Sequence, residues 1–151
     1  MKKAAIQLSF GLVLTILIIV AIFFVALKGI SVLMSNVSQM QKDQFVSDLT
    51  SFYKQTLRLP SGSSIPVKIS SKFDTLCFYN KNGDGSLNNL APYEDVLTIE
   101  TKNVFGIYRG KLIPLTSFSL ATPKKEVCFN RGISGQFNFT MISKGDSIDI
   151  K

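Results

Sequence analysis

The two cysteines, Cys77 and Cys128, are the residues of this sequence with the clearest potential for chemistry. Each lies in an apolar run typical of a strand, Leu-Cys-Phe-Tyr-Asn around the first and Val-Cys-Phe-Asn around the second. Paired strands can bring the two thiols together, so we predict a disulfide, worth roughly 4 kcal/mol for a loop of about fifty residues. The alternative is two free, buried thiols in a cytosolic domain.

Catalysis and metal binding have few candidate residues. Histidine is absent, which excludes from this chain Ser-His-Asp and Cys-His catalysis and most zinc sites; two cysteines cannot ligate an iron–sulfur cluster alone. Ser51 and Lys54 match the S-x-x-K pattern of Ser–Lys acyl enzymes, but the companion motifs are missing. We therefore predict no catalytic residues, no metal site and no cofactor, and a protein that is not an enzyme.

The loop from Asn80 to Asn88 has part of the pattern of a calcium-binding loop. Oxygen side chains occupy its first, third, fifth and ninth positions, and glycine the sixth. However, Asn80 replaces the usual leading aspartate, and Ala91 stands where a bidentate glutamate belongs. These departures favour an ordinary Gly/Asn turn.

The elements that position these residues begin with an apolar stretch at 8–27. Only Ser9 and Thr15 have polar side chains there, and a helix of this length spans about 30 Å, the hydrocarbon thickness of a bilayer. We predict an uncleaved transmembrane anchor; the alternatives are a cleaved secretory signal and a buried core helix. Lys2 and Lys3 precede the stretch and Lys28 follows it, which favours a cytoplasmic N-terminus and an extracytoplasmic C-terminal domain.

Residues 28–60 are predicted to form a helical stalk. Apolar residues recur in this segment at spacings of three, four and five. A continuous helix would end near Arg58, before Pro60-Ser61-Gly62. The alternative is a second helix that begins at a capping box formed by Ser38 and Gln41.

Residues 61–151 are predicted to form a small antiparallel β domain. Short β-type runs alternate with turns rich in Gly, Asn, Asp and Pro. The predicted strands are Ile65–Ile69, Thr75–Tyr79, Val96–Thr101, Val104–Tyr108, Lys111–Pro114, Glu126–Phe129, Gln136–Ile142 and Ser147–Ile150. The last two would form a hairpin around Ser143–Asp146.

The surface offers two further signals. Asn36 and Asn138 begin N-glycosylation triplets, and Asn138 is the better candidate because Asn36 lies close to the predicted membrane.

The charge of the chain is positive, since the 151 residues include 17 Lys and Arg against 10 Asp and Glu. No aromatic–basic nucleic-acid motif accompanies this charge, so we expect no nucleic-acid partner. Solvated loops, or a weak affinity for anionic polymers or lipid headgroups, would account for it.

The N-terminal sequence Lys3-Ala4-Ala5-Ile6-Gln7-Leu8-Ser9-Phe10 resembles the class III signal peptide of archaeal type IV pilin-like proteins. Shared features are a short basic leader, a small residue before the cleavage point, Gln-x-Ser and an uninterrupted apolar helix. The resemblance covers about the first thirty residues and implies cleavage near Ala4 or Ala5, with the helix retained. Gly11 departs from the family, which often has a glutamate there for assembly.

Taken together, the sequence predicts an α+β chain in which a long N-terminal transmembrane helix continues into a stalk, followed by a small antiparallel β domain. The segments are a basic leader at 1–7, the span at 8–27, the stalk at 28–60 and an extracytoplasmic domain at 61–151. We predict a single-pass, pilin-like protein with a structural or interaction role at the cell surface; the alternative is a membrane-anchored binding module that does not assemble. Candidate partners are the lipid bilayer and, in assembly, further copies or other pilin-like subunits.

Overall fold

The chain is α+β, with an N-terminal apolar helix and a small antiparallel β domain, which confirms the predicted fold class at this level. A computed structural model describes the backbone of residues 2–151 and the side chains of residues 11–28 and 39–151. Two compact units divide the chain, Met1–Met40 and Gln41–Lys151.

Helix α1 has the bounds Lys2–Leu57, so the division between the units falls inside it. Its residues from Gln41 onward belong to the globular unit, although the sequence placed them in a stalk. The helix ends close to the predicted Arg58, because Pro60 lacks the N–H that another helical turn requires. The capping box predicted at Ser38 lies outside the described residues.

The globular unit contains seven strands and two short helices after α1. Their bounds are β1 Ser64–Ser70, β2 Thr75–Tyr79, the 3-10 helix η1 Ala91–Tyr93, α2 Glu94–Ile99, β3 Val104–Tyr108, β4 Lys111–Thr116, β5 Glu126–Asn130, β6 Gln136–Ser143 and β7 Ile148–Ile150. Seven of the eight predicted strands are therefore confirmed.

The strand predicted at Val96–Thr101 is wrong, because α2 occupies most of that segment. Its β-branched residues suggested a strand, yet only Leu97 is buried, while Ile99 is 83% exposed. Pro92 lies in the preceding turn η1, where a missing N–H is tolerated. The acidic Glu94 and Asp95 in the first turn of α2 also favour a helix, because their negative charges interact favourably with the positive N-terminal end of the helix dipole.

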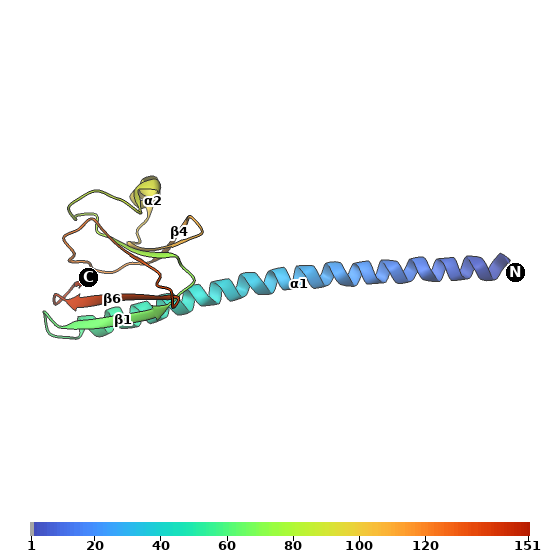
Figure 1. Ribbon diagram of the computed structural model, residues 1–151, viewed down its shortest axis with the longest axis horizontal. Coiled ribbons are helices and arrows are strands. Elements are labelled where there is room, and N and C mark those ends of the chain that lie inside the picture. The colour runs from blue at the N-terminus through green and yellow to red at the C-terminus, as the bar shows by residue number, and fades with distance from the viewer. Residues whose placement is uncertain (1) are drawn as a thin grey trace. The chain divides into compact units, whose positions relative to one another are not determined.

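Two antiparallel sheets form the β domain. One has three strands in the order β1-β6-β7, and the other has four in the order β4-β3-β2-β5. In β6, Phe137, Phe139 and Met141 are buried and alternate with more accessible residues, as the sequence pattern predicts. Figure 1 shows β1 and β6 side by side along the C-terminal part of α1.

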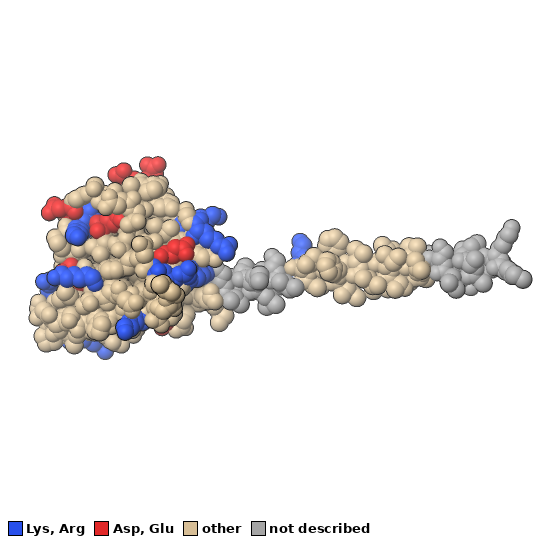
Figure 2. All heavy atoms as spheres, in the orientation of Figure 1, with Lys and Arg blue, Asp and Glu red and all other residues tan. Residues whose placement is uncertain are grey.

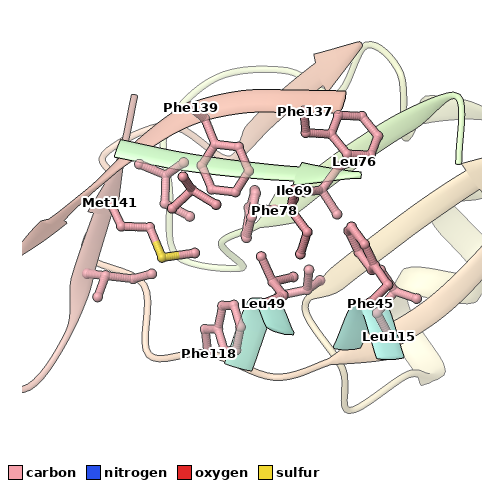
Figure 3. Close-up of a cluster of buried hydrophobic side chains, with 14 of the residues drawn as sticks. Phe45, Leu49, Ile69, Leu76, Phe78, Leu115, Phe118, Phe137, Phe139 and Met141 are labelled. Atoms are coloured by element: carbon pink, nitrogen blue, oxygen red, sulfur yellow. The ribbon is translucent and has the colours of Figure 1, made fainter. Parts of the chain in front are cut away.

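The main core lies where α1 meets both sheets (Figure 3). Phe45 and Leu49 of α1 are buried among side chains of both sheets. The Phe45 ring packs edge-on against Phe73 and Phe137, with centroids 5.4 and 6.2 Å apart. Farther along α1, Tyr53 stacks on Phe118 at 4.2 Å. The helix is thus one wall of the core of the β domain.

A second, smaller core covers the opposite face of the four-stranded sheet. Cys77, Leu90, Leu97 and Phe105 form it, from β2, β3 and the excursion between them. Successive residues of a strand point to opposite faces, so Leu76 and Phe78 join the main core while Cys77 joins this one. The segment that contains η1 and α2 therefore covers the face of the four-stranded sheet on which Cys77 lies.

We predict that Leu49→Ala lowers the free energy of unfolding of the β domain by about 2–5 kcal/mol, the range for deleting a fully buried leucine side chain. Leu49 is fully buried, so its loss would leave a cavity between α1 and the sheets. Denaturant unfolding of the full chain in micelles, followed by near-ultraviolet circular dichroism, measures the change. Ser47→Ala, on the exposed side of the same helix, is the control. Equal midpoints for the two variants would show that α1 does not contribute to this core.

Candidate functional site: the cysteine pair and the apolar helix

Cys77 and Cys128 lie directly opposite each other on the adjacent strands β2 and β5. Their α-carbons are 4.1 Å apart and their sulfur atoms 2.03 Å apart, which is a disulfide contact. The close approach of the α-carbons is typical of the narrow, non-hydrogen-bonded pairs of an antiparallel ladder. The arrangement fits the pairing predicted from the sequence.

The bridge joins strand β5 to its only neighbour within the four-stranded sheet. Strand β5 is an edge strand, held on one side by backbone hydrogen bonds to β2. The bridge adds a covalent link on the face covered by Leu90 and Leu97. It also closes a loop across 51 positions that contains α2, β3 and β4. Its physical role is therefore to restrict the unfolded chain and hold the edge of the sheet.

Glu126 of β5 is a key residue that the sequence analysis did not single out. Its carboxylate accepts hydrogen bonds from the backbone N–H groups of Asn88, Asn89 and Leu90 at 2.9–3.1 Å. The side-chain amide of Asn89 donates a fourth, at 3.1 Å. Charge-assisted hydrogen bonds of this kind are the stronger ones. Glu126 therefore holds the start of the excursion that covers the cysteines. No local sequence signal could reveal this, because the partners lie 36–38 positions away.

Cys77, Cys128 and Glu126 also bring three potential metal-ligand atoms within 4.8 Å of one another. Metals bind the cysteine thiolate, and in the disulfide neither sulfur is a thiolate. Both carboxylate oxygens of Glu126 already accept N–H donors. These three residues therefore stabilise the fold, through a disulfide and through hydrogen bonds to the backbone, and their ligand atoms are not available to an ion.

The loop weighed as a calcium site is organised as a turn. The side-chain oxygen of Asn80 accepts the N–H of Asn82 at 3.1 Å, and its amide donates to the carbonyl of Thr122 at 2.7 Å. A Cβ at Gly83 would lie 2.5 Å from the backbone of Lys124. The glycine is thus required by close backbone packing, and Asn80 is oriented by protein partners.

The other residues with potential chemistry are exposed. Ser51 and Lys54 lie on the accessible side of α1, whereas Ser–Lys catalysis requires a lysine buried beside the serine. Asn138 is exposed on β6, opposite Lys68 of β1, so its side chain is accessible for the predicted glycosylation. The leader residues Lys3, Ala4 and Ala5, and the other triplet residue Asn36, lie outside the described side chains.

The stretch Gly11–Lys28 of α1 is long and apolar enough to cross a membrane, and none of it is buried by other parts of the described chain. A signal sequence has the same properties. Thirteen large apolar side chains between Leu12 and Leu27 are about half exposed or more. The hydroxyl of Thr15 donates to the carbonyl of Gly11 at 2.8 Å, so this polar group is satisfied within the helix. The stretch is thus suited to an apolar surrounding.

Comparison with known proteins finds no match among protein-family models, curated proteins or solved structures. Function is therefore inferred from the residues of this chain.

We predict that a Cys77→Ser/Cys128→Ser variant unfolds with a free energy about 2–5 kcal/mol lower than that of the unchanged chain, because the loop constraint is lost. A thiol count on denatured, unreduced protein, prepared with an alkylating agent present, measures the bridge directly. No free thiol is expected before reduction, and two after it. Two free thiols before reduction would contradict the bridge and the extracytoplasmic location inferred from it.

We predict that Glu126→Gln lowers the free energy of unfolding by about 1–3 kcal/mol, because a neutral amide cannot accept all the backbone N–H groups that the carboxylate accepts. Hydrogen exchange at Asn88–Leu90 should rise together with the loss of stability. Asp146→Asn, the same carboxylate-to-amide change at an exposed position of the β6–β7 turn, is the control and should change stability by less than about 0.5 kcal/mol. Similar behaviour of the two variants would mean that Glu126 does not hold the excursion.

Proposed function

We propose that this protein is a single-pass, pilin-like membrane protein whose small β domain has a structural or interaction role at the cell surface. The observation that carries the proposal is the helical stretch Gly11–Lys28, in which Thr15 has the only polar side chain before Lys28 and which the rest of the described chain does not cover. A water-soluble protein would bury such a surface, whereas a bilayer accommodates it.

Transfer energetics support an anchor at this stretch. Its thirteen large apolar side chains favour a helix centre in lipid by about 0.3–0.6 kcal/mol each, or roughly 4–8 kcal/mol together. Lys28 at its end can extend its ammonium group to the headgroup layer. The hydrogen bond from Thr15 leaves that hydroxyl satisfied in a medium without water.

Orientation and location follow from charge and from the cysteines. Lys2 and Lys3 before the span favour a cytoplasmic N-terminus, which leaves the β domain outside the cytoplasm. A disulfide between Cys77 and Cys128 supports the same orientation, because such bonds persist mainly outside the reducing cytosol.

The resemblance of the first thirty residues to archaeal pilin-like leaders supports the pilin-like architecture. Removal of the leader near Ala4 or Ala5 would leave the apolar helix at the mature N-terminus. In the globular unit, Phe45 and Leu49 of α1 pack against the β domain of the same chain, which suits a subunit built on one long helix. Assembly would then add other pilin-like subunits as partners.

A second candidate function is a membrane-anchored binding module that does not assemble. Gly11 favours it, because the glutamate that pilin-like proteins often use for assembly is missing at that position. Both functions share the anchor and the exposed β domain and differ only in whether subunits associate.

Fractionation of whole cells tests the anchor. We expect the chain to remain in the membrane pellet after alkaline carbonate extraction. Leu17→Arg/Ile18→Arg should release the chain or prevent its accumulation, because each central arginine costs about 2.5–3.5 kcal/mol of insertion free energy. Leu17→Val/Ile18→Val keeps the stretch apolar and is the matched control. An arginine variant that stays in the pellet like the control would contradict a transmembrane anchor.

Two further measurements on the same cells separate the alternatives. Shearing without detergent should release filaments that contain this chain if it assembles, and strict retention in the membrane fraction favours the binding module. Intact-mass measurement should show the loss of four to six residues if the leader is cleaved as the resemblance implies. A mature chain that begins at or beyond Lys28 would overturn the anchor.

A further inference from the structure

An unusual exposed side chain lies at the turn between β5 and β6. Ile133 is fully exposed, at 111% of its reference accessible area. The turn is nevertheless closed by hydrogen bonds, from the N–H of Gly132 to the carbonyl of Gln136 and from the N–H of Gly135 to the carbonyl of Gly132, both at 2.9 Å. Single exposed apolar residues are common, so this one gains meaning only from its neighbours.

Arginine and lysine side chains gather next to this turn. Arg131, which begins it, directs its guanidinium to the carbonyls of Ser71 and Lys72 and to the carboxylate of Asp74. The Arg131–Asp74 ion pair is 3.3 Å long. The backbone N–H of Arg109 also donates to Asp74, at 2.9 Å. Asp74 therefore connects the β5–β6 turn to the turn between β3 and β4.

The turn between β3 and β4 adds further positive charge. Arg109 and Lys72 both lie over the ring of Tyr108, with distances of 5.2 and 6.0 Å to its centroid. Lys111 pairs with Tyr108 in the β3–β4 ladder. Figure 2 shows Lys and Arg side chains gathered around this part of the β domain. Four cations, Lys72, Arg109, Lys111 and Arg131, are thus carried by the two turns and by the β1–β2 connection, where Asp74 pairs with Arg131.

The neighbouring part of α1 changes this balance only slightly. Lys42, Asp43 and Asp48 lie there, and Asp48 accepts a hydrogen bond from Gln44 at 2.9 Å. The positive excess is therefore found on the two turns and on Lys72 of the β1–β2 connection, and not on the helix.

These turns lie at the end of the globular unit where the chain enters it. Gln41 is the first residue of the unit, and it lines one surface depression together with Lys72, Ser134 and Gly135. Gln41 follows Lys28, the end of the candidate span, by thirteen positions. The exposed isoleucine and the cations are thus found at the end of the globular unit that contains its first residue, Gln41.

The connection is short enough to keep this end near a bilayer that holds the span. Thirteen residues reach about 20 Å as a helix. Four of the five residues at 30–34 are apolar, which suits the interfacial layer, and from there only about 10 Å of helix remain to Gln41. Membrane helices tilt by about 20° on average, and headgroup charge acts over a Debye length of about 10 Å.

We propose that this end of the β domain docks on an anionic lipid surface. Ile133 enters the interfacial layer, and Lys72, Arg109, Lys111 and Arg131 contact headgroup phosphates. An exposed apolar side chain with cations on neighbouring segments is the combination that interfacial elements use. Lipid is the partner favoured over an acidic protein, because the anchor holds a bilayer surface within reach at a high effective concentration. The inference rests on the proposed anchor.

Tryptophan fluorescence of the full chain tests the docking, because the sequence contains no tryptophan. Ile133→Trp is placed in vesicles that contain brominated acyl chains and about 30% anionic lipid. We expect a blue-shifted emission and quenching at least about threefold stronger than that of Ile99→Trp. Ile99 is the matched control, an isoleucine that is 83% exposed on α2.

The charge requirement is tested in the background of Ile133→Trp. Lys72→Gln/Lys111→Gln should reduce the bromolipid quenching to the level in zwitterionic vesicles. Lys124→Gln/Lys125→Gln is the control, because it removes the same charge just before the start of β5, at the opposite end of that strand from the β5–β6 turn. This pair should leave the quenching unchanged. Equal effects of the two pairs would overturn the assignment of these cations.

The remaining outcomes separate this inference from the proposed anchor. If the chain fails to float with the vesicles, the anchor itself fails. If it floats but the indole at position 133 is quenched by aqueous iodide and not by bromolipid, the docking is overturned and the anchor stands. If that indole is shielded from both quenchers, protein covers the turn, which also overturns the lipid assignment.

Discussion

The burial of one face of α1 between the two sheets is the interaction on which the β domain depends. Phe45 and Leu49 fill the space between the sheets, and the three-stranded sheet offers Phe137, Phe139 and Met141 to the same core. Without the helix, these side chains would face water, at a cost of about 1.5–3 kcal/mol for each large one. The helix is therefore part of the β domain from Gln41 onward, whatever precedes it.

A sheet covered on both faces follows from this arrangement. The four-stranded sheet uses one face for the α1 core and the other for Cys77, Leu90, Leu97 and Phe105. The second face is covered by an excursion with only one short α-helix, α2, which has little core of its own. The Cys77–Cys128 bridge beneath it and the carboxylate of Glu126 at its start compensate for that small core. Polar and covalent links are concentrated where apolar burial is least.

The described parts of α1 differ in how their apolar residues are distributed. Residues Gly11–Lys28 suit an apolar medium, whereas the globular unit has charged turns and an ordinary polar surface. Apolar residues lie on all sides of the helix within Gly11–Lys28, whereas from Gln41 onward the buried apolar residues of α1 lie on one side.

The sequence alone determined the local features of this protein. Apolar length predicted the helix at 8–27, alternation predicted β6, and the bounds of Thr75–Tyr79 and Val104–Tyr108 were predicted without error, because these signals come from neighbouring residues. Val96–Thr101 was mistaken for a strand because its β-branched composition outweighed the helix signals of Pro92 and Glu94. Placing both cysteines in strands was enough to suggest their pairing.

Only the tertiary structure decided how distant residues meet. Strand order, the contact of Glu126 with Asn88–Leu90, and the contacts of Asp74 with Arg109 and Arg131 depend on segments that are tens of residues apart. No periodicity encodes such contacts, since they arise from the way two sheets pack on one helix. The sequence therefore determined which residues are apolar, charged or able to bridge, and the packing of the chain decided which of them act together.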